Sequence, residues 1–368
     1  MRVTSISSVN FLGKIIDSHT HVGTHDGGTY TKQDLDVFVK SELPNKDTIE
    51  KIFVSDLDVL HSVKGEYEGN KAVLDMFKDS SKYELFASCS PKDGDISNIK
   101  RLFEENPNKF IGLKFHPDIQ ELDLSDKKYE PYMEFASEKN LPCLFHSQVD
   151  LVEGGKLDPN KIHISDPENI YAFAKKYHKT PVVMAHLGSG YNEAHDKTID
   201  VLVKAVKNGD ANLYADISWV DIDSGVKDGH KTKEHIIKAI KKLKGIGDST
   251  WEFGDQSYRL MFGTDAPLAR FKEKNSKKSI QNYTDFVEDI KHAIKTDKDL
   301  SKDADKIIDD LFYNNAKKLY LSTQKKNKTS YKKYTLIALP VIAFLGALFY
   351  LNKTKNDKNQ KAKKVKNF

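Results

Sequence analysis

The stretch that decides the fold is Lys14-Ile15-Ile16-Asp17-Ser18-His19-Thr20-His21-Val22, a short apolar strand that ends in two histidines. Seven further apolar runs of this kind follow it along the chain. Most of them start about 25 to 40 residues apart, which is the length of one strand-plus-helix unit. They span 51–54, 85–89, 110–115, 142–146, 181–186, 213–217 and 260–264. Eight such units predict a closed barrel of parallel strands.

Segments with helical periodicity lie between these runs. Apolar side chains recur every three or four residues in 129–139, 169–177, 198–207 and 233–243, and two more helices are expected near 279–294 and 304–319. The strands are apolar almost throughout, which is typical of a parallel sheet covered by helices. The predicted fold class is therefore α/β, a (β/α)8 TIM barrel, and an open doubly wound sheet is the structural competitor.

Charge is divided unevenly along the chain. The 368 residues carry a formal net charge of +4, but residues 323–368 contain twelve Lys and one acidic residue, so residues 1–322 carry −7. A mildly acidic barrel argues against nucleic acid as a partner. The two cysteines, Cys89 and Cys143, lie in apolar strand-like runs and offer neither a disulfide framework nor a metal-binding pair.

The C-terminal part of the chain predicts a membrane anchor. A Lys-rich linker is expected at 323–333, and residues 334–351 form a run of 18 residues without a charge. As a helix this run would be about 27 Å long, enough to cross a hydrocarbon core. We therefore expect a barrel domain at 1–322, a transmembrane helix at 334–351 and a basic disordered tail at 352–368. The N-terminus has no pattern of a secretory signal, so the barrel is expected on the cytoplasmic side of the membrane.

Chemistry-bearing residues gather where the predicted strands end. Asp17, His19 and His21 alternate along the first strand, so their side chains share one face. Active sites of barrels are built at the carboxyl ends of the strands. The other strand-end residues are Lys114, His116, His146, His186 and Asp265.

Histidines and a carboxylate that converge on one point form a set that zinc accepts, with a position left open for water. His-x-His alone is a weak signal because chance supplies it in a chain of this length. The convergence of several strand ends makes the joint signal strong.

These motifs resemble the amidohydrolase superfamily, and most of all its amidohydrolase-related, single-metal branch. Residues 17–21 match Asp-x-His-x-His, and residues 112–117 match a Gly-(hydrophobic)-Lys-(hydrophobic)-His-Pro strand. Further matches are Leu-Pro-x-x-x-His at 141–146, His-x-Gly at 186–188, Gly-Thr-Asp-x-Pro at 263–267 and the closing Asn-Ala-(basic)-x-Leu pattern within 313–320. The resemblance covers residues 15 to 320 in the expected order, and the predicted membrane segment is not part of it.

The resemblance implies a metal-dependent hydrolase that acts on a small molecule. Its metal ligands would be His19, His21, His146 and Asp265, around one divalent ion, with zinc expected. Asp265 would also be catalytic, because it would accept a proton from metal-bound water that then attacks an amide, ester or lactone carbonyl. His186 would be the second catalytic residue, either as a ligand or as a polariser of the carbonyl.

Four residues near this set keep open roles. Lys114 either binds substrate or packs, or it is carboxylated and bridges two ions as in two-metal relatives. His116 is expected beside the ligands rather than among them, and Asp17 is expected to orient a ligand. Asp216, on the seventh strand, either supports the site or caps a turn.

Two other functions fit the same residues. The same branch includes non-oxidative decarboxylases, and a membrane-tethered metal-binding protein without catalysis would need a similar ligand set. A poised base beside the ligands favours an enzyme over a storage protein. Specificity in such barrels is set by loops, expected here at 24–43, 148–166 and 219–233.

Overall fold

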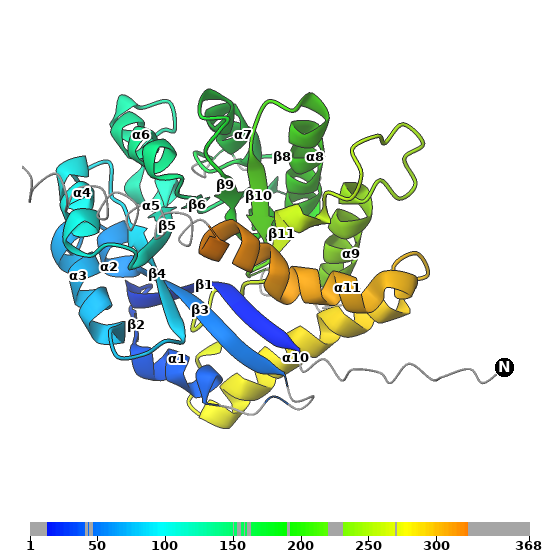
Figure 1. Cartoon of the computed structure of the whole chain (residues 1–368), viewed down its shortest axis with the longest axis horizontal. Coiled ribbons are helices and arrows are strands. Elements are labelled where there is room, and N and C mark those ends of the chain that lie inside the picture. The colour runs from blue at the N-terminus through cyan, green and yellow to red at the C-terminus, as the bar shows by residue number, and fades with distance from the viewer. Residues whose placement is uncertain are drawn as a thin grey trace, which may run out of the picture. The chain divides into compact units, whose positions relative to one another are not determined.

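Parallel strands form the centre of the protein (Figure 1). The computed structural model describes residues 13–322, apart from 41–42, 44–46, 150, 153–155, 158, 160–162, 190–191, 220–230 and 269–270. The chain divides into two compact units, Met1–Leu321 and Ser322–Phe368, and the fold below is that of the first unit.

All eight apolar runs of the sequence contain a strand. Neighbouring strands pair in parallel. In their order around the sheet they are β1 (Lys14–His25), β3 (Thr48–Asp56), β4 (Tyr83–Ser88), β5 (Phe110–Phe115), β6 (Cys143–Phe145), β9 (Val182–Met184), β10 (Leu213–Asp216) and β11 (Leu260–Met261).

The sheet closes on itself between β11 and β1. Thr20 and Ala266 form a parallel bridge. The backbone N–H of Ser18 donates to the carbonyl of Phe262 at 3.1 Å, and that of Asp265 donates to the carbonyl of His19 at 2.8 Å. These bonds join the first strand to the last, so the fold is a barrel and not an open doubly wound sheet.

Each strand is followed by a helix that covers the outside of the barrel. The main helices are α1 (Lys32–Val39), α3 (Glu66–Phe77), α4 (Ile96–Glu105), α6 (Glu130–Lys139), α7 (Pro167–Lys176), α8 (Asn192–Asn208), α9 (Lys231–Leu243) and α10 (Ser276–Thr296). Several begin at side-chain caps: Asp95 accepts the N–H of Ser97 at α4, and Asn275 accepts that of Lys277 at α10. Helix α1 contacts α10, so the outer layer closes as well.

Short elements lie at the carboxyl ends of the strands. They are α2 (Leu57–Leu60) after β3, α5 (Pro117–Gln120) after β5, the hairpin of β7 (Leu151–Val152) with β8 (Lys156–Leu157), and β2 (Gly28–Tyr30), which pairs antiparallel with β1. The predicted last helix is α11 (Ala304–Asp309), which continues into the π-helical turns η6 (Asp310–Asn314) and η7 (Lys317–Leu321).

The barrel interior is filled by a compact apolar layer. Its members include one residue from seven of the eight strands, namely Ile16, Phe53, Phe86, Ile111, Leu144, Val183 and Met261. Tyr320 from η7 packs edge-on against Phe53 and Phe86, with ring centroids 5.4 and 5.3 Å away. Along each of these strands the residue of this layer precedes the polar residues at the strand end. The polar residues therefore lie directly above an apolar layer.

The predicted fold class is wrong in one respect, the transmembrane helix. Within the described part of residues 13–322, no helix is both long enough and apolar enough to span a membrane. The described residues form the barrel alone. The predicted linker (323–333), membrane span (334–351) and tail (352–368) all lie outside the described residues. The expected cytoplasmic side of a membrane depended on the same helix and stays a prediction.

Candidate metal centre

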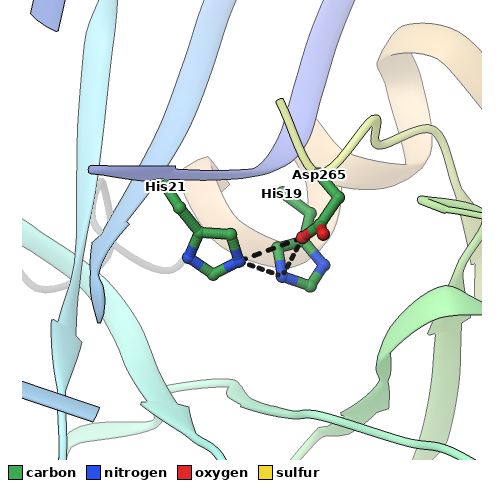
Figure 2. A group of neighbouring side chains, drawn as sticks. All are labelled: His19, His21 and Asp265. Atoms are coloured by element: carbon green, nitrogen blue, oxygen red, sulfur yellow. Dashed lines mark hydrogen bonds and ion pairs between the residues drawn. The ribbon is translucent and has the colours of Figure 1, made fainter. Parts of the chain in front are cut away.

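His19 and His21 meet Asp265 at the carboxyl end of the barrel. The two Nε2 atoms lie 3.1 Å apart, and Asp265 Oδ1 lies 3.4 Å from the first and 3.0 Å from the second. Figure 2 shows the two imidazoles of β1 turned toward the carboxylate that follows β11. All three side chains are buried, at 6% exposure or less. Three ligand-type atoms therefore converge on one buried point.

The outer nitrogens of both histidines are held by polar partners. His19 Nδ1 lies 2.9 Å from Asp216 Oδ2, and His21 Nδ1 lies 2.8 Å from Ser55 Oγ. Burial by itself would raise the pKa of Asp216, but His19 and its hydrogen bond outweigh burial and keep that pKa well below its usual range. An ionised Asp216 accepts the Nδ1–H of His19, so the Nε2 lone pair of His19 faces inward.

The inward atoms fit a divalent cation. Burial lowers the pKa of both His19 and His21, which keeps the imidazoles neutral. Burial opposes the ionisation of Asp265, but the surrounding imidazoles outweigh it and hold its pKa far below the usual range. Its Oδ1 is buried, and no N–H or O–H of the described residues is oriented to donate to it. Two neutral imidazole nitrogens and an anionic oxygen at this spacing form a ligand set that suits zinc.

Lys114, at the end of β5, contacts the same group. Its Nζ lies 3.0 Å from His19 Nε2, and the side chain is almost completely buried. Burial lowers the pKa of Lys114 to about 8, so its ammonium loses its proton far more easily than an exposed lysine does. Because Lys114 contacts His19, the predicted role of packing outside the site is excluded.

His146, a predicted ligand, lies outside the group of three. Its Nδ1 is 3.1 Å from His186 Nε2, and its Nε2 is 3.1 Å from Gln148 Oε1. The carbonyl oxygen of Gln148 can only accept, so His146 Nε2 carries the proton and donates it. The structure therefore places His146 beside His186, one imidazole away from His19.

His186 joins the two histidine groups. Its ring stacks on that of His19 with centroids 4.8 Å apart, and its Nδ1 lies 2.8 Å from Ser218 Oγ. His186, His19 and Asp216 form a second set of atoms that are close enough to share an ion. Burial lowers the pKa of His186 to about 3, so this imidazole is neutral.

His116 lies beside the predicted ligands. Its ring stacks on His146 with centroids 3.7 Å apart. Its Nδ1 accepts the backbone N–H of Ile119 at 3.4 Å, which caps the short helix α5. This contact orients the imidazole at the wall of the site.

Asp17 binds backbone N–H groups and the Thr264 hydroxyl rather than an imidazole. Its carboxylate accepts the Thr264 N–H at 3.0 Å and the Thr264 hydroxyl at 2.6 Å, and it also accepts the N–H of His19 at 3.5 Å. Burial raises the pKa of Asp17 to about 7. The predicted task of holding a ligand's ring is performed by Asp216, while Asp17 joins β1 to the segment that carries Asp265.

Backbone strain is concentrated around these side chains. Asp265, His186 and Trp219 have φ values of +66°, +62° and +61°. Few residues other than glycine adopt this left-handed region, and those that do are typical of functional sites.

Sequence reasoning missed two serines that position the histidines. Ser55 is the penultimate residue of β3 and lies beside His21, and Ser218 lies two residues after Asp216. For Ser218 the sequence does contain a signal. The Asp-x-Ser spacing at 216–218 repeats the alternation of polar residues at 17–21 and so puts Ser218 on the same face as Asp216. Serine is so common at strand ends that the spacing alone does not single it out.

A cavity of about 450 Å³ opens onto the site. Its volume suits a small organic molecule. The lining residues from the site itself are His21, Lys114, His116, His146, His186 and Asp265.

Comparisons with known proteins agree with this architecture. A family model described as Amidohydrolase matches residues 85–321. No curated protein matches the chain.

Among solved structures, an amidohydrolase from Burkholderia multivorans with bound Zn has a TM-score of 0.54 at 12% identity, covering 83% of this chain and 99% of that one. The probable 2-pyrone-4,6-dicarboxylic acid hydrolase of Acinetobacter baumannii, solved with citric acid bound, has a TM-score of 0.52 at 13% identity, covering 83% and 98%. At such identities these structures support the fold. Because the family model spans more than half of the chain, this protein belongs to the amidohydrolase family.

Proposed function

We propose that the chain is a metal-dependent hydrolase of small molecules, with one divalent ion, zinc, held by His19, His21 and Asp265. The observation that carries this proposal is the convergence of His19 Nε2, His21 Nε2 and Asp265 Oδ1, three atoms of ligand type, on one buried point. The bound Zn in the Burkholderia multivorans structure supports the choice of element. A divalent ion at such a site supplies acidity to water and polarises a carbonyl.

The protein's own groups supply the proton transfers. Asp265 is ionised at neutral pH and lines the cavity, so its carboxylate can take a proton from water and return it to a leaving group. His186 lines the same cavity and stacks on His19, and we assign it the polarisation of the carbonyl, with a substrate oxygen taking the place of His146 Nδ1 as acceptor of its N–H. We assign the bond cleaved to an amide, ester or lactone.

A substrate screen with a matched variant tests the proposal. The zinc-loaded full chain is assayed with small amides, esters, lactones and carboxylated phenols, beside Asp265→Asn and the surface control Asp75→Asn. We expect hydrolysis of at least one carbonyl class, a loss of about a hundredfold or more in Asp265→Asn, and unchanged turnover in Asp75→Asn.

Two results would contradict hydrolysis. Release of CO₂ from the carboxylated phenols, without hydrolysis in any other class, would identify a decarboxylase. Stoichiometric zinc without turnover of any compound would favour a metal-binding protein.

A further inference from the structure

An apolar cluster lies at the mouth of the barrel, separate from the two clusters that fill the barrel and its outer layer. Leu57, Leu60 and Leu268 are its buried members, and Tyr30 and Trp219 pack against them. Leu57 begins the segment after β3, Trp219 follows β10, and Leu268 follows β11. The cluster is therefore built from the carboxyl ends of several strands, where the metal centre also lies.

Three members of this cluster line the cavity: Leu57, Trp219 and Leu268. Leu268 lies next to Asp265, since its backbone N–H donates to the Asp265 carbonyl at 3.0 Å. The Trp219 indole lies 6.5 Å from the His186 ring, between centroids. A bulky residue at φ +61° costs conformational energy, so surrounding contacts must hold the Trp219 backbone in this conformation.

The remaining part of the cavity wall is mostly polar. It is formed by His25, His116, Asp118, His146, Gln148 and Ser189, with Ile119 as an apolar member. The cavity is thus amphipathic: one side offers aliphatic and aromatic surface, and the other offers hydrogen-bonding groups, with Asp265 and Lys114 in the same lining.

We propose that Leu57, Trp219 and Leu268 form a subsite for an apolar substituent of the substrate. The substrate class is then a small amphiphilic carbonyl compound, with an alkyl group next to the reacting carbonyl and polar atoms on the side of His146 and Gln148. This inference rests on the proposed function for its reaction. The affinity of the subsite for an alkyl chain can be tested without turnover.

Methyl ketones of increasing length test binding, because they carry a carbonyl and an alkyl chain but no leaving group. The full chain contains two tryptophans, Trp219 and Trp251, so a Trp251→Phe background isolates the emission of Trp219. Titration with 2-butanone, 2-hexanone and 2-octanone is expected to change this emission. The dissociation constant should fall about fourfold for each added methylene.

Lactones with alkyl side chains test turnover in the same way. In the zinc-loaded protein, kcat/KM should rise from γ-butyrolactone to γ-hexalactone and γ-octalactone. Leu268→Ala should flatten this rise, because the longer chains lose the removed surface. Ile119→Ala, a matched aliphatic truncation among the polar wall residues, should keep the rise.

The two series separate the failure of the inference from that of the proposed function. Ketone affinity that does not depend on chain length would overturn the subsite, whatever the lactones show. A ketone series with the expected slope but no lactone hydrolysis would keep the subsite and contradict hydrolysis. A rise that Ile119→Ala removes and Leu268→Ala keeps would place the alkyl chain on the polar wall and overturn the assignment.

Discussion

Asp216 fixes the tautomer of His19. Its Oδ2 accepts the Nδ1–H at 2.9 Å, and its Oδ1 accepts the backbone N–H groups of His186 and Ser218, both at 3.0 Å. One carboxylate therefore orients a ligand and two neighbouring residues. Carboxylates that hold a ligand's outer N–H are typical of metal sites and raise the basicity of the ligand.

The substitution Asp216→Asn should weaken zinc binding by about ten- to a hundredfold. The neutral amide does not offset the positive charge of the ion, and it holds the His19 imidazole by a weaker hydrogen bond than the carboxylate does. Competition with a chromogenic chelator measures this affinity. Asp200→Asn, an exposed carboxylate on α8, is the control and should bind zinc as the wild type does. Equal zinc affinity in Asp216→Asn and wild type would show that Asp216 does not support the metal.

The sequence was sufficient to predict the strand-end residues. It was not sufficient to predict which of them would bind a metal and which would position another residue. The two-residue period of a strand predicted that Asp17 shares a face with His19 and His21. The structure instead has a register shift between Asp17 and Thr20 in β1, and Asp17 hydrogen-bonds to Thr264. Such an irregularity re-aims a side chain, and it depends on the partner strand rather than on the local sequence.

The position of His146 also depends on distant partners. The sequence places it correctly at the end of β6, but Gln148 and His186 then determine which way its imidazole nitrogens face. Gln148 and His186 are common residue types without a spacing rule, so the sequence could not show that His146 lies apart from the other three predicted ligands.

At the scale of elements, eight apolar runs were sufficient to predict the strands, because strands buried on both faces need little beyond apolar side chains. Two strands are shorter than predicted. β9 ends at Met184 and β11 at Met261, and in each case the segment that follows carries a site residue with positive φ, His186 at +62° and Asp265 at +66°. These conformations do not belong to a strand and are typical of functional sites.

β5 makes a close approach to its neighbour that only glycine permits. A Cβ on Gly112 would lie 2.5 Å from the carbonyl oxygen of Pro142 and 3.1 Å from the Phe86 ring. Backbone cannot move aside as a side-chain terminus can. Gly112 therefore sets the spacing of β5 against β6, and with it the position of Lys114.

Gly112→Ala should lower the free energy of unfolding by about 1–3 kcal/mol through overpacking. Denaturant unfolding with a constant zinc concentration measures it. Gly65→Ala serves as the control, because its Cβ would meet only the end of the flexible Glu68 side chain, and it should cost less than about 1 kcal/mol. A loss in Gly112→Ala no larger than the control's would refute the close-packing argument.

At the scale of the whole molecule, the barrel brings residues from distant parts of the sequence to one buried point. His19 and Asp265 lie at opposite ends of the barrel sequence and become neighbours because β11 closes against β1. The charge split and the uncharged run at 334–351 led to a membrane helix that the described residues do not contain. The hydropathy of one segment is a weaker basis for a structural prediction than a pattern of eight strands that must pack together.

The central claim is that His19, His21 and Asp265 hold one divalent ion. The most direct measurement is elemental analysis of the purified full chain, after zinc loading and removal of excess metal without chelators. We predict about one zinc per chain in the wild type and in Lys114→Ala, and far less than one in His19→Ala. No stoichiometric metal in the wild type, or two ions of which Lys114→Ala loses one, would contradict the account.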